Sequence, residues 1–303
     1  METSSFAVVT GAFSYTGKYI TRRLLNQGRR VITLTGHPER SNEFGGRVPA
    51  RSFNFDQPAA LEESLRGAEV LYNTYWVRFS HDDVTFERAV ENTRRLITAA
   101  KNAGVRRIVH VSITNPSVKS NLPYFRGKAI LEDAIRASGL SYAILRPTVI
   151  FGDEDILINN IAYLLRRFPF FAVPGTGQYR LQPVFVEDFA ELVVQQGSQS
   201  EDVVLDAVGP RVYTFNELVQ LIGNKIGRSV RLVHVPPTLA LWLSRLLGTL
   251  VGDVLLTRDE LDGLMQELLV SEQSTTGQTR LEEWLENNAA QVGRRYASEL
   301  NRH

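Results

Sequence analysis

The sequence predicts an α/β protein that contains a doubly wound parallel sheet and a smaller, mostly helical C-terminal domain. Strand-like apolar runs alternate with amphipathic helical stretches from residue 6 to residue 112, and this alternation favours parallel strands joined by right-handed crossovers. A glycine-bearing turn follows the first strand, and the alternation stops beyond Pro147. We therefore place a first domain at residues 1–150, to which 184–208 returns, and a second domain at 151–183 and 209–303.

The composition limits the possible functions. With 303 residues, 43% of them hydrophobic and 22% charged, the chain can bury a full core. A net charge of +1 offers no electrostatic case for binding nucleic acid or an anionic membrane surface. The absence of cysteine excludes disulfides, cysteine-ligated zinc and a thiol nucleophile, and the five histidines show no metal-ligand spacing.

Targeting signals are not evident in the sequence. A strand pattern begins almost at once, without a basic segment followed by an apolar core, so we expect no signal peptide. The most apolar later stretch, residues 239–256, carries Arg245 and Asp253 and is too short to span a bilayer. We therefore expect a cytoplasmic protein without a transmembrane segment, and the lack of cysteine fits a reducing compartment.

The first strand, residues 6–10, ends in a turn that leads into a helix from Thr16. Gly11 and Gly17 occupy the places of the first and last glycines in a dinucleotide-binding fingerprint, and Ser14 replaces the middle glycine. The backbone N–H groups and the positive helix end at this turn suit a pyrophosphate. Ser14 could bond a phosphate oxygen or partly obstruct the site, and an ordinary turn without a ligand is the alternative. The residues assigned to this cradle are Gly11, Phe13, Ser14, Tyr15, Thr16 and Gly17.

The second strand, residues 30–35, ends without the acidic side chain that binds the adenosine ribose of NAD in doubly wound folds. A glycine, His37 and a proline follow it, and the first carboxylate is Glu39. Without a negative charge to repel a 2′-phosphate, His37 and Arg40 could attract one. We therefore favour NADP(H) over NAD(H), although Arg40 is also compatible with a solvated loop.

Two further strand ends carry candidate cofactor contacts. Asp56 follows the third strand, residues 51–55, where an acid can meet the adenine amino group in this kind of fold. The fourth strand ends at Thr74, and Tyr75 and Trp76 come next, at the edge where doubly wound sheets bind ligands. We expect these side chains to line the nicotinamide pocket, with core packing as the alternative for Trp76.

A candidate catalytic pair follows the fifth strand, residues 107–112. Tyr124 and Lys128 lie one turn apart on a helix that begins at Pro123, so both side chains project from one face. A tyrosine phenol has an ordinary pKa of about 10, which must fall by about two to three units for acid/base catalysis near neutrality. A lysine ammonium one turn away favours the phenolate and can also bond the nicotinamide ribose hydroxyls.

Several segments resemble the extended and atypical short-chain dehydrogenase/reductases, which have a Rossmann fold and include NAD-dependent epimerases and dehydratases. They are the Thr-Gly turn at 10–11, the Tyr124/Lys128 pair, Leu-Arg-Pro-Thr-Val-Ile-Phe-Gly at 145–152 and Pro-Val-Phe-Val-Glu-Asp at 183–188. The segments at 124–129, 146–155 and 256–259 are similar to the nucleotide-binding accessory subunit of respiratory complex I and its bacterial relatives.

This resemblance implies roles for individual residues. Tyr124 would be the general acid/base, and Lys128 would bind the ribose and lower the tyrosine pKa. Thr114 or Ser112 would orient the substrate, with Ser112 and Pro147 also beside the cofactor. The chain departs from the family pattern because Ile113 stands near the usual catalytic serine position and only about ten residues separate Thr114 from Tyr124.

The second part of the chain is expected to form a substrate or partner domain. It contains a helix over 155–167, an aromatic loop over 168–177 and a helix over 213–226 that Thr214 and Glu217 cap, while a strand over 203–207 lies in the segment that returns to the first domain. Residues 236–256 place leucines and Trp242 on one helical stripe, which is expected to pack in the core, to contact a protein partner or to form a lipophilic substrate gate.

Two functions follow from the sequence. The first is an NAD(P)-dependent oxidoreductase or epimerase that transfers hydride at an alcohol or ketone carbon of a small-molecule substrate, while Tyr124 exchanges the proton. The second is a non-catalytic NADP(H)-binding protein that acts as a structural plug or redox sensor for a protein partner. The Tyr124/Lys128 pair favours the enzyme, whereas Ile113 and the short loop favour the second function.

Overall fold

The computed structural model describes residues 5–80 and 84–298, apart from the side chains of residues 250 and 251. The chain forms two compact units. The first extends to Pro147 and adds Phe189–Asp206, and the second consists of Thr148–Asp188 and the chain from Ala207 on. The division of roles between a nucleotide-binding part and a substrate or partner part stays a prediction.

A seven-stranded sheet organises the first unit and confirms the predicted fold class. Its order is β11-β6-β5-β4-β1-β2-β3, and β1 pairs in parallel with both β2 and β4. The chain therefore reverses its winding direction at β1, and ligands of doubly wound folds bind beside such a reversal, at the carboxyl ends of the strands. The strands are Phe6–Thr10 (β1), Arg30–Thr35 (β2), Ala50–Ser52 (β3), Ala68–Asn73 (β4), Arg107–Val111 (β5), Ser141–Pro147 (β6) and Val203–Ala207 (β11).

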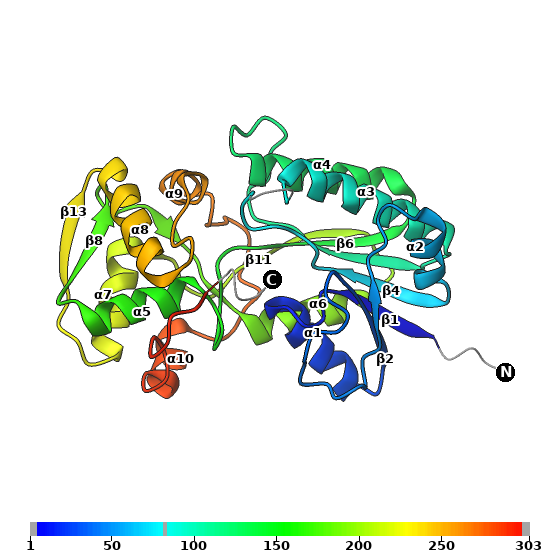
Figure 1. Cartoon of the computed structure of the whole chain (residues 1–303), viewed down its shortest axis with the longest axis horizontal. Helices are drawn as coiled ribbons and strands as arrows, with labels where there is room; N and C mark the ends of the chain where they lie inside the picture. Colours follow the sequence, from blue (N-terminus) through cyan, green and yellow to red (C-terminus); the bar gives the residue numbers. More distant parts are fainter. Residues whose placement is uncertain (1–4, 81–83, 299–303) are drawn as a thin grey trace. The chain divides into compact units, whose positions relative to one another are not determined.

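Helices cover both faces of this sheet (Figure 1). The helices α2, α3 and α4 lie on one face, and α1 and α6 lie on the other. Leucine, isoleucine and valine side chains of β1, β4 and β5 pack against α2, α3 and α4 in one buried cluster. The helices are Tyr15–Asn26 (α1), Pro58–Leu65 (α2), Phe86–Asn102 (α3), Pro123–Ser138 (α4) and Val186–Gly197 (α6).

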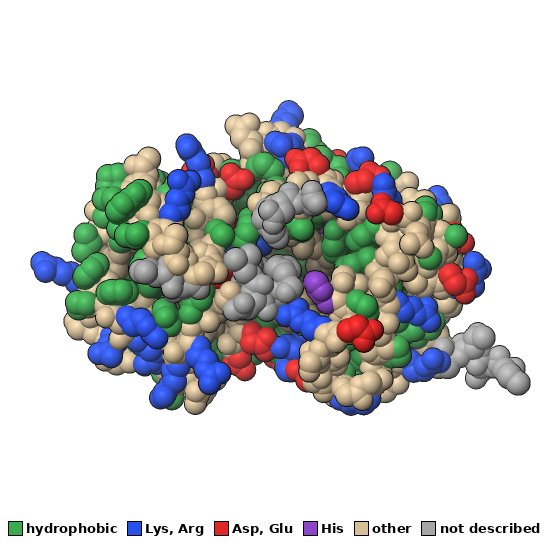
Figure 2. All heavy atoms as spheres, viewed as in Figure 1, with side chains coloured by type: hydrophobic (Ala, Val, Ile, Leu, Met, Phe, Trp, Pro, Cys, Tyr) green, Lys and Arg blue, Asp and Glu red, His purple; other side chains and the backbone are tan. Residues whose placement is uncertain are grey.

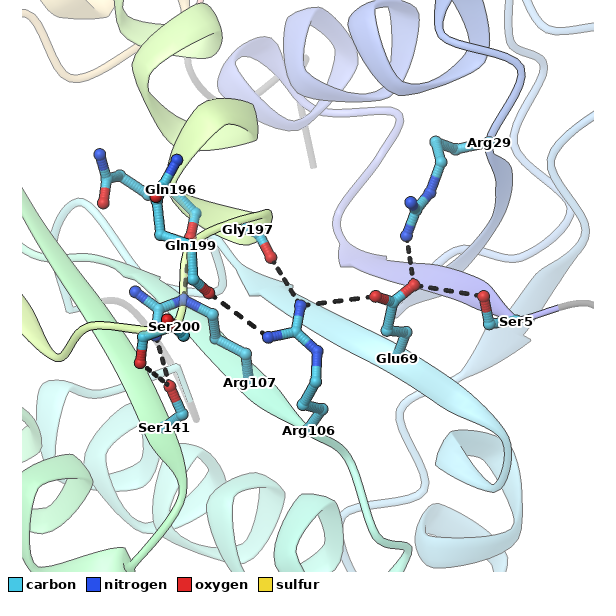
Figure 3. A network of polar contacts seen from close by, with 10 residues as sticks. All are labelled: Ser5, Arg29, Glu69, Arg106, Arg107, Ser141, Gln196, Gly197, Gln199 and Ser200. Carbon is cyan, nitrogen blue, oxygen red and sulfur yellow. Dashed lines mark hydrogen bonds and ion pairs between the residues drawn. The ribbon is translucent and has the colours of Figure 1, made fainter.

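Two adjacent arginines tie the start of β5 to the end of α6 (Figure 3). The fully buried Arg107 donates from Nε to the carbonyl of Gln196 at 2.8 Å, from Nη2 to the carbonyl of Glu201 at 2.7 Å, and from Nη1 to the Ser141 hydroxyl. Arg106 donates to the carbonyl of Gly197 at 2.9 Å. The carbonyls that end a helix lack intrahelical partners, and here arginine N–H groups satisfy them.

The second unit is built mainly of helices around small sheets. Its buried cluster includes Phe151, Phe215 and Trp284. Its strands are Ile150–Phe151 (β7), Phe170–Pro174 (β8), Arg180–Leu181 (β9), Val184–Phe185 (β10), Tyr213–Thr214 (β12) and Arg231–Val235 (β13). Its helices are Leu157–Arg167 (α5), Phe215–Lys225 (α7), Pro237–Val251 (α8), Arg258–Met265 (α9) and Leu281–Asn288 (α10). None of the helices in the described part of the chain has both the length and the apolar character needed to cross a membrane.

The main difference from the predicted elements concerns residues 168–177, for which the sequence predicts a loop. Residues Phe170–Pro174 instead form β8, which pairs in parallel with β13. The Pro and Gly residues around this segment mark its ends rather than its interior, and its partner strand lies far along the chain. The predicted cap of the following helix is confirmed, because Thr214 and Glu217 form a reciprocal capping box on α7.

Candidate nucleotide and catalytic site

The turn after β1 needs both of its glycines. Gly11 has a φ of +65°, which favours glycine, and its N–H donates to the carbonyl of Leu34 at 2.8 Å. A Cβ at Gly17 would lie 2.1 Å from the Gly11 carbonyl oxygen, so only glycine lets α1 approach the strand this closely. This geometry matches the turn and packing roles that the fingerprint assigns to its first and last glycines.

Ser14 is turned into the cradle rather than out of it. Its hydroxyl donates to the Gly11 carbonyl at 2.6 Å, and its backbone N–H donates to the same oxygen at 2.8 Å. The hydroxyl proton is therefore used within the turn and does not point to a phosphate. Because the first turn of α1 contains no acidic residue, the partial positive charge at this helix end is not offset locally.

The other cradle residues support the turn by packing. The ring of Phe13 lies 6.3 Å from that of Phe44, and Tyr15 packs edge-on against Tyr19, while Thr16 is half-buried in the first turn of α1. Thr33 also holds the turn, although the sequence analysis did not select it. Its buried hydroxyl accepts the N–H of Ala12 at 3.0 Å and donates to the Val9 carbonyl at 2.9 Å.

His37 and Arg40 lie in one turn directly after β2. His37 is exposed, Arg40 is half-buried, and the Arg40 N–H donates to the His37 carbonyl at 3.1 Å. Glu43, farther along the same loop, binds the guanidinium of Arg22 of α1, which holds the pKa of that carboxyl low. The turn therefore offers a histidine and an arginine, with Glu39 between them, at the place where NAD-binding folds carry an acid.

Asp56 lies apart from the turn and binds another residue. Its exposed carboxylate pairs with Arg95 of α3 at 2.5 Å, and Arg95 also donates to the Phe55 carbonyl at 3.2 Å. A contact between Asp56 and an adenine amino group would have to share the carboxylate with this arginine. That role stays a prediction.

Thr74 and Tyr75 join the end of β4 to the end of β1. The Thr74 hydroxyl donates to the Thr10 carbonyl at 2.5 Å, and the N–H groups of Thr74 and Tyr75 donate to the Thr10 hydroxyl at 2.8 and 3.0 Å. The Tyr75 ring packs against Phe53 and Phe55, and burial raises the pKa of its phenol. Thr74 therefore borders the glycine turn, whereas Tyr75 packs under the loop after β3.

Trp76, in the loop after β4, is the centre of an aromatic cluster with side chains of α3 and α4. Its ring lies 6.0 Å from Phe86 and 5.7 Å from Tyr124, and the Lys128 ammonium sits 4.6 Å above it. A Cβ at position 127 would lie 2.7 Å from this ring, so Gly127 gives the indole its place against the helix. The indole Nε1 is buried and has no hydrogen-bond partner within the described residues.

Tyr124 and Lys128 lie on the same helix, α4, and both contact Trp76, which follows β4. Tyr124 is half-buried, whereas Lys128 is only 2% exposed. The Lys128 ammonium donates to the Val111 carbonyl at 2.7 Å. Burial lowers the pKa of Lys128 to about 7, and the charge of Glu132 only partly opposes this shift. This lysine is therefore poised to gain or lose its charge near neutrality.

The residues at the ends of β5 and β6 are buried. The Ser112 hydroxyl donates to Glu132 at 2.6 Å, and the Thr114 N–H donates to the Pro147 carbonyl at 3.1 Å. Ile113 is 8% exposed. Ser112 is thus engaged with a carboxylate of α4, and the substrate-orienting role of Thr114 stays a prediction.

A row of polar side chains below this edge escaped the sequence analysis. The Thr10 hydroxyl donates to Asn73 at 3.1 Å, and the Asn73 amide lies 2.9 Å from His110 Nδ1. Burial, followed by the nearby charge of Lys128, holds the pKa of His110 well below its ordinary value, so the imidazole is neutral. The signal in the sequence was a polar residue at, or next to, the end of each of the neighbouring strands β1, β4 and β5.

Glu132 was also missed, although it lies one turn after Lys128 on the same helix. It is 1% exposed and accepts two N–H groups of Arg146, at 2.8 and 2.5 Å, as well as one from Arg136 at 3.0 Å. Two arginines thus compensate the charge of this buried carboxylate. Within the described residues, no cluster of three or more potential metal ligands forms.

A family model matches the part of the chain that contains the glycine turn and most of the large sheet. Residues 11–161 match the family model described as NAD(P)H-binding. The mitochondrial NADH-ubiquinone oxidoreductase 40 kDa subunit of Neurospora crassa is 25% identical over 280 residues, which cover 89% of this chain and 73% of that protein. These matches confirm the resemblance that the motifs indicate. The cytoplasmic location stays an expectation, since this relative is mitochondrial.

Two solved structures share the fold across almost the whole chain. The Citrobacter sp. triphenylmethane reductase complexed with NADP(H) has a TM-score of 0.75 at 18% identity, and the match covers 94% of this chain and 99% of that one. The Escherichia coli NADPH-dependent quinone oxidoreductase QOR2 complexed with NADPH has a TM-score of 0.75 at 20% identity, over 93% and 99%. At these identities the likeness establishes the fold.

Proposed function

We propose that this chain, which carries a domain of the NAD(P)H-binding family over residues 11–161, is an oxidoreductase or epimerase that transfers hydride at an alcohol or ketone carbon. The observation that carries the proposal is the placement of Tyr124 and Lys128 on one face of α4, both in contact with Trp76. Trp76 follows β4, which lies beside β1 and its glycine turn, and the pair follows β5, the next strand of the sheet.

The residues present fit a nicotinamide dinucleotide. The Gly11 turn and the N-terminus of α1 would hold the pyrophosphate, because a larger residue at Gly17 would collide with the turn. His37 and Arg40 support a preference for NADP(H), since they would meet a 2′-phosphate in a turn with no carboxylate at the strand end. When bound, the nicotinamide would supply or accept the hydride.

The chain itself would handle the proton. Tyr124 would give its phenolic proton to a developing alkoxide, or take one from an alcohol, because its ring is half-buried at the edge of the sheet. Protonated Lys128 would favour the phenolate by its positive charge. Trp76 would fix the distance between the two, since it packs edge-on against Tyr124 and face-on to the Lys128 ammonium.

Replacement of Tyr124 by Phe tests this assignment. We expect Tyr124→Phe to keep NADPH affinity within about twofold and to lower the rate of NADPH oxidation by about 100-fold or more, the range for loss of a general acid/base. The acceptors would be p-benzoquinone and a panel of aryl ketones, followed by absorbance at the NADPH band. Asp133→Asn, a change of an exposed residue on the same helix, serves as control. Unchanged turnover in Tyr124→Phe would contradict the catalytic role.

A second candidate function has its own support. Lys128 donates to the Val111 carbonyl rather than pointing outward, and Ile113 stands near the usual serine position. In this candidate the chain binds NADP(H) without turnover, and 236–256 would contact a protein partner, as expected of a relative of a respiratory-chain subunit. Purified protein that binds NADPH tightly yet reduces no acceptor would favour it.

A further inference from the structure

Helix α8 exposes an apolar stripe in the second unit. Leu239, Trp242 and Leu246 are 42%, 59% and 49% exposed, and their spacing places them on one face of the helix. Ala240 and Gly248 lie on the opposite, buried face. The core packing considered for this stripe is therefore wrong for these three side chains. They contact either solvent or a binding partner.

The neighbouring strands add aromatic side chains to this stripe. Phe168 and Phe170 are 41% and 51% exposed, with ring centroids 6.2 Å apart. Arg231 of β13 stands directly opposite Phe170 in the parallel pair, so both side chains project from the same face. Helix α8 packs beside β8. We call Phe168, Phe170, Val233, Leu239, Trp242 and Leu246, with the arginines around them, the apolar–basic surface.

The segments that supply the helices and strands of this surface contain no acidic residue. The sequence contains no Asp or Glu in residues 156–186 or 218–252, which supply α5, β8, β13 and α8. Arg167, Arg228, Arg231 and Arg245 are exposed and form no ion pair with any residue that the structure describes. Figure 2 shows hydrophobic side chains over α8, β8 and β13, with Lys and Arg side chains around them.

The concentration of positive charge is local. Burial, and then the neighbouring cations of Arg294 and Arg228, lower the pKa of Arg166 at the end of α5. The whole-chain net charge of +1 hides this cluster, because carboxylates elsewhere balance it. The charge argument against an anionic surface therefore applies to the chain as a whole and not to this face.

We propose that the apolar–basic surface docks the protein on an anionic lipid bilayer. Exposed Trp, Phe and Leu side chains can enter the boundary between headgroups and acyl chains, and unpaired arginines beside them are attracted to anionic headgroups. Arginine stems also lie along apolar surface while their guanidinium groups stay in water. A bilayer fits better than a protein partner, because its anionic headgroups offer negative charge across the whole surface, whereas a protein partner would have to place carboxylates opposite these four exposed arginines.

Vesicle flotation tests the proposal on the full chain. We expect binding to vesicles of phosphatidylcholine mixed with phosphatidylglycerol, weaker binding in high salt, and little binding to phosphatidylcholine alone. Trp242→Ser combined with Phe170→Ser should reduce the partition coefficient about tenfold or more. Arg231→Gln combined with Arg245→Gln should reduce it about tenfold and remove most of its salt dependence.

Matched controls lie on the first unit. Val118→Ser and Arg94→Gln replace exposed residues there and should leave vesicle binding unchanged. Absence of binding to anionic vesicles, or equal binding by the double variants, would overturn the proposal. Concentration-dependent dimerisation that Trp242→Ser abolishes, without vesicle binding, would assign the surface to a second copy instead. NADPH binding is measured in parallel, so that failure here is distinguishable from failure of the proposed function.

Discussion

The ammonium of Lys128 occupies an environment where a charge is costly. It has one carbonyl acceptor and one aromatic face, and Glu132 beyond it is already engaged with two arginines. Its pKa of about 7 lies far below the value of an exposed lysine. A group whose pKa is depressed on folding binds fewer protons in the folded chain, so the free energy of unfolding rises with pH between the two pKa values.

We predict that Lys128→Met changes this pH dependence. Below pH 7 the buried charge destabilises the native protein fully, and the penalty fades as the pH rises from about 7 towards the ordinary lysine value. The variant should therefore be more stable relative to the native protein at pH 7 than at pH 9.5, with a difference that changes by at most about 1.4 kcal/mol per pH unit. Urea unfolding at several pH values measures this, and a difference that is independent of pH would contradict it.

The residues of the site were predictable to different degrees. Gly11 and Gly17 follow from spacing alone, because the steric demand of a tight strand–helix turn is local. The pairing of Asn73 with His110 was not, because it joins two strands separated by a helix. Nor was the burial of Lys128, since a helix face shows which residues point together and not what lies opposite them.

At the scale of elements, Arg107 links a strand to the end of a helix. Its guanidinium is held in the interior by the Gln196 carbonyl at the end of α6 and by the Glu201 carbonyl beyond it, and the carboxylate oxygen of Asp202 lies 3.9 Å away. These hydrogen bonds satisfy both partners. The arginine gains acceptors, and the carbonyl at the end of α6 gains a donor that the helix itself does not supply. The position of α6 against the sheet therefore depends on this side chain.

We predict that Arg107→Met destabilises the fold by about 3 kcal/mol, because it leaves two part-buried carbonyls and a hydroxyl without their charged donor. Arg106→Gln is the matched control, since that neighbouring side chain is largely exposed and should cost less than about 1 kcal/mol. Urea unfolding with fluorescence detection measures both. Equal losses would show that the buried contacts of Arg107 contribute no more than those of an exposed arginine.

The alternating strands and helices up to residue 147 were predictable because each element carries its own hydrophobic period. In the second unit this approach failed at β8, because its exposed Phe170 is followed by two half-buried and then two buried residues, which show no alternation. Its partner strand β13 also lies far along the chain, after the helices α6 and α7. Short paired strands in the same unit, such as β9 with β12, offer too few residues for any period to appear.

At the scale of the whole molecule, the nucleotide couples the site to stability. A ligand that binds only the folded chain raises the melting temperature in proportion to the logarithm of its concentration over its dissociation constant. Binding of a nicotinamide cofactor is supported by the family match, whereas the choice between the two cofactors stays a prediction. Thermal stability is thus a measure of cofactor choice that needs no substrate.

We predict that NADPH stabilises the protein more than NADH does, and that His37→Gln with Arg40→Gln removes the difference. Loss of charge-assisted contacts to the 2′-phosphate should weaken NADPH about tenfold to 100-fold and leave NADH almost unchanged. Arg47→Gln in the same loop is the control. Equal loss for both dinucleotides would mean that the changes disturb the loop, and no loss would remove these side chains from the site.

The hydrogen bonds between Thr10 and residues 74–75 affect how a ligand can enter the site. One hydroxyl and one carbonyl of Thr10 hold three groups from the chain beyond β4, so the two strands cannot spread at the point where the winding reverses unless all three bonds break together. A ligand must therefore bind over strand ends that these hydrogen bonds already join. Its binding would move the loops at this edge of the sheet and leave the strands β1 and β4 in place.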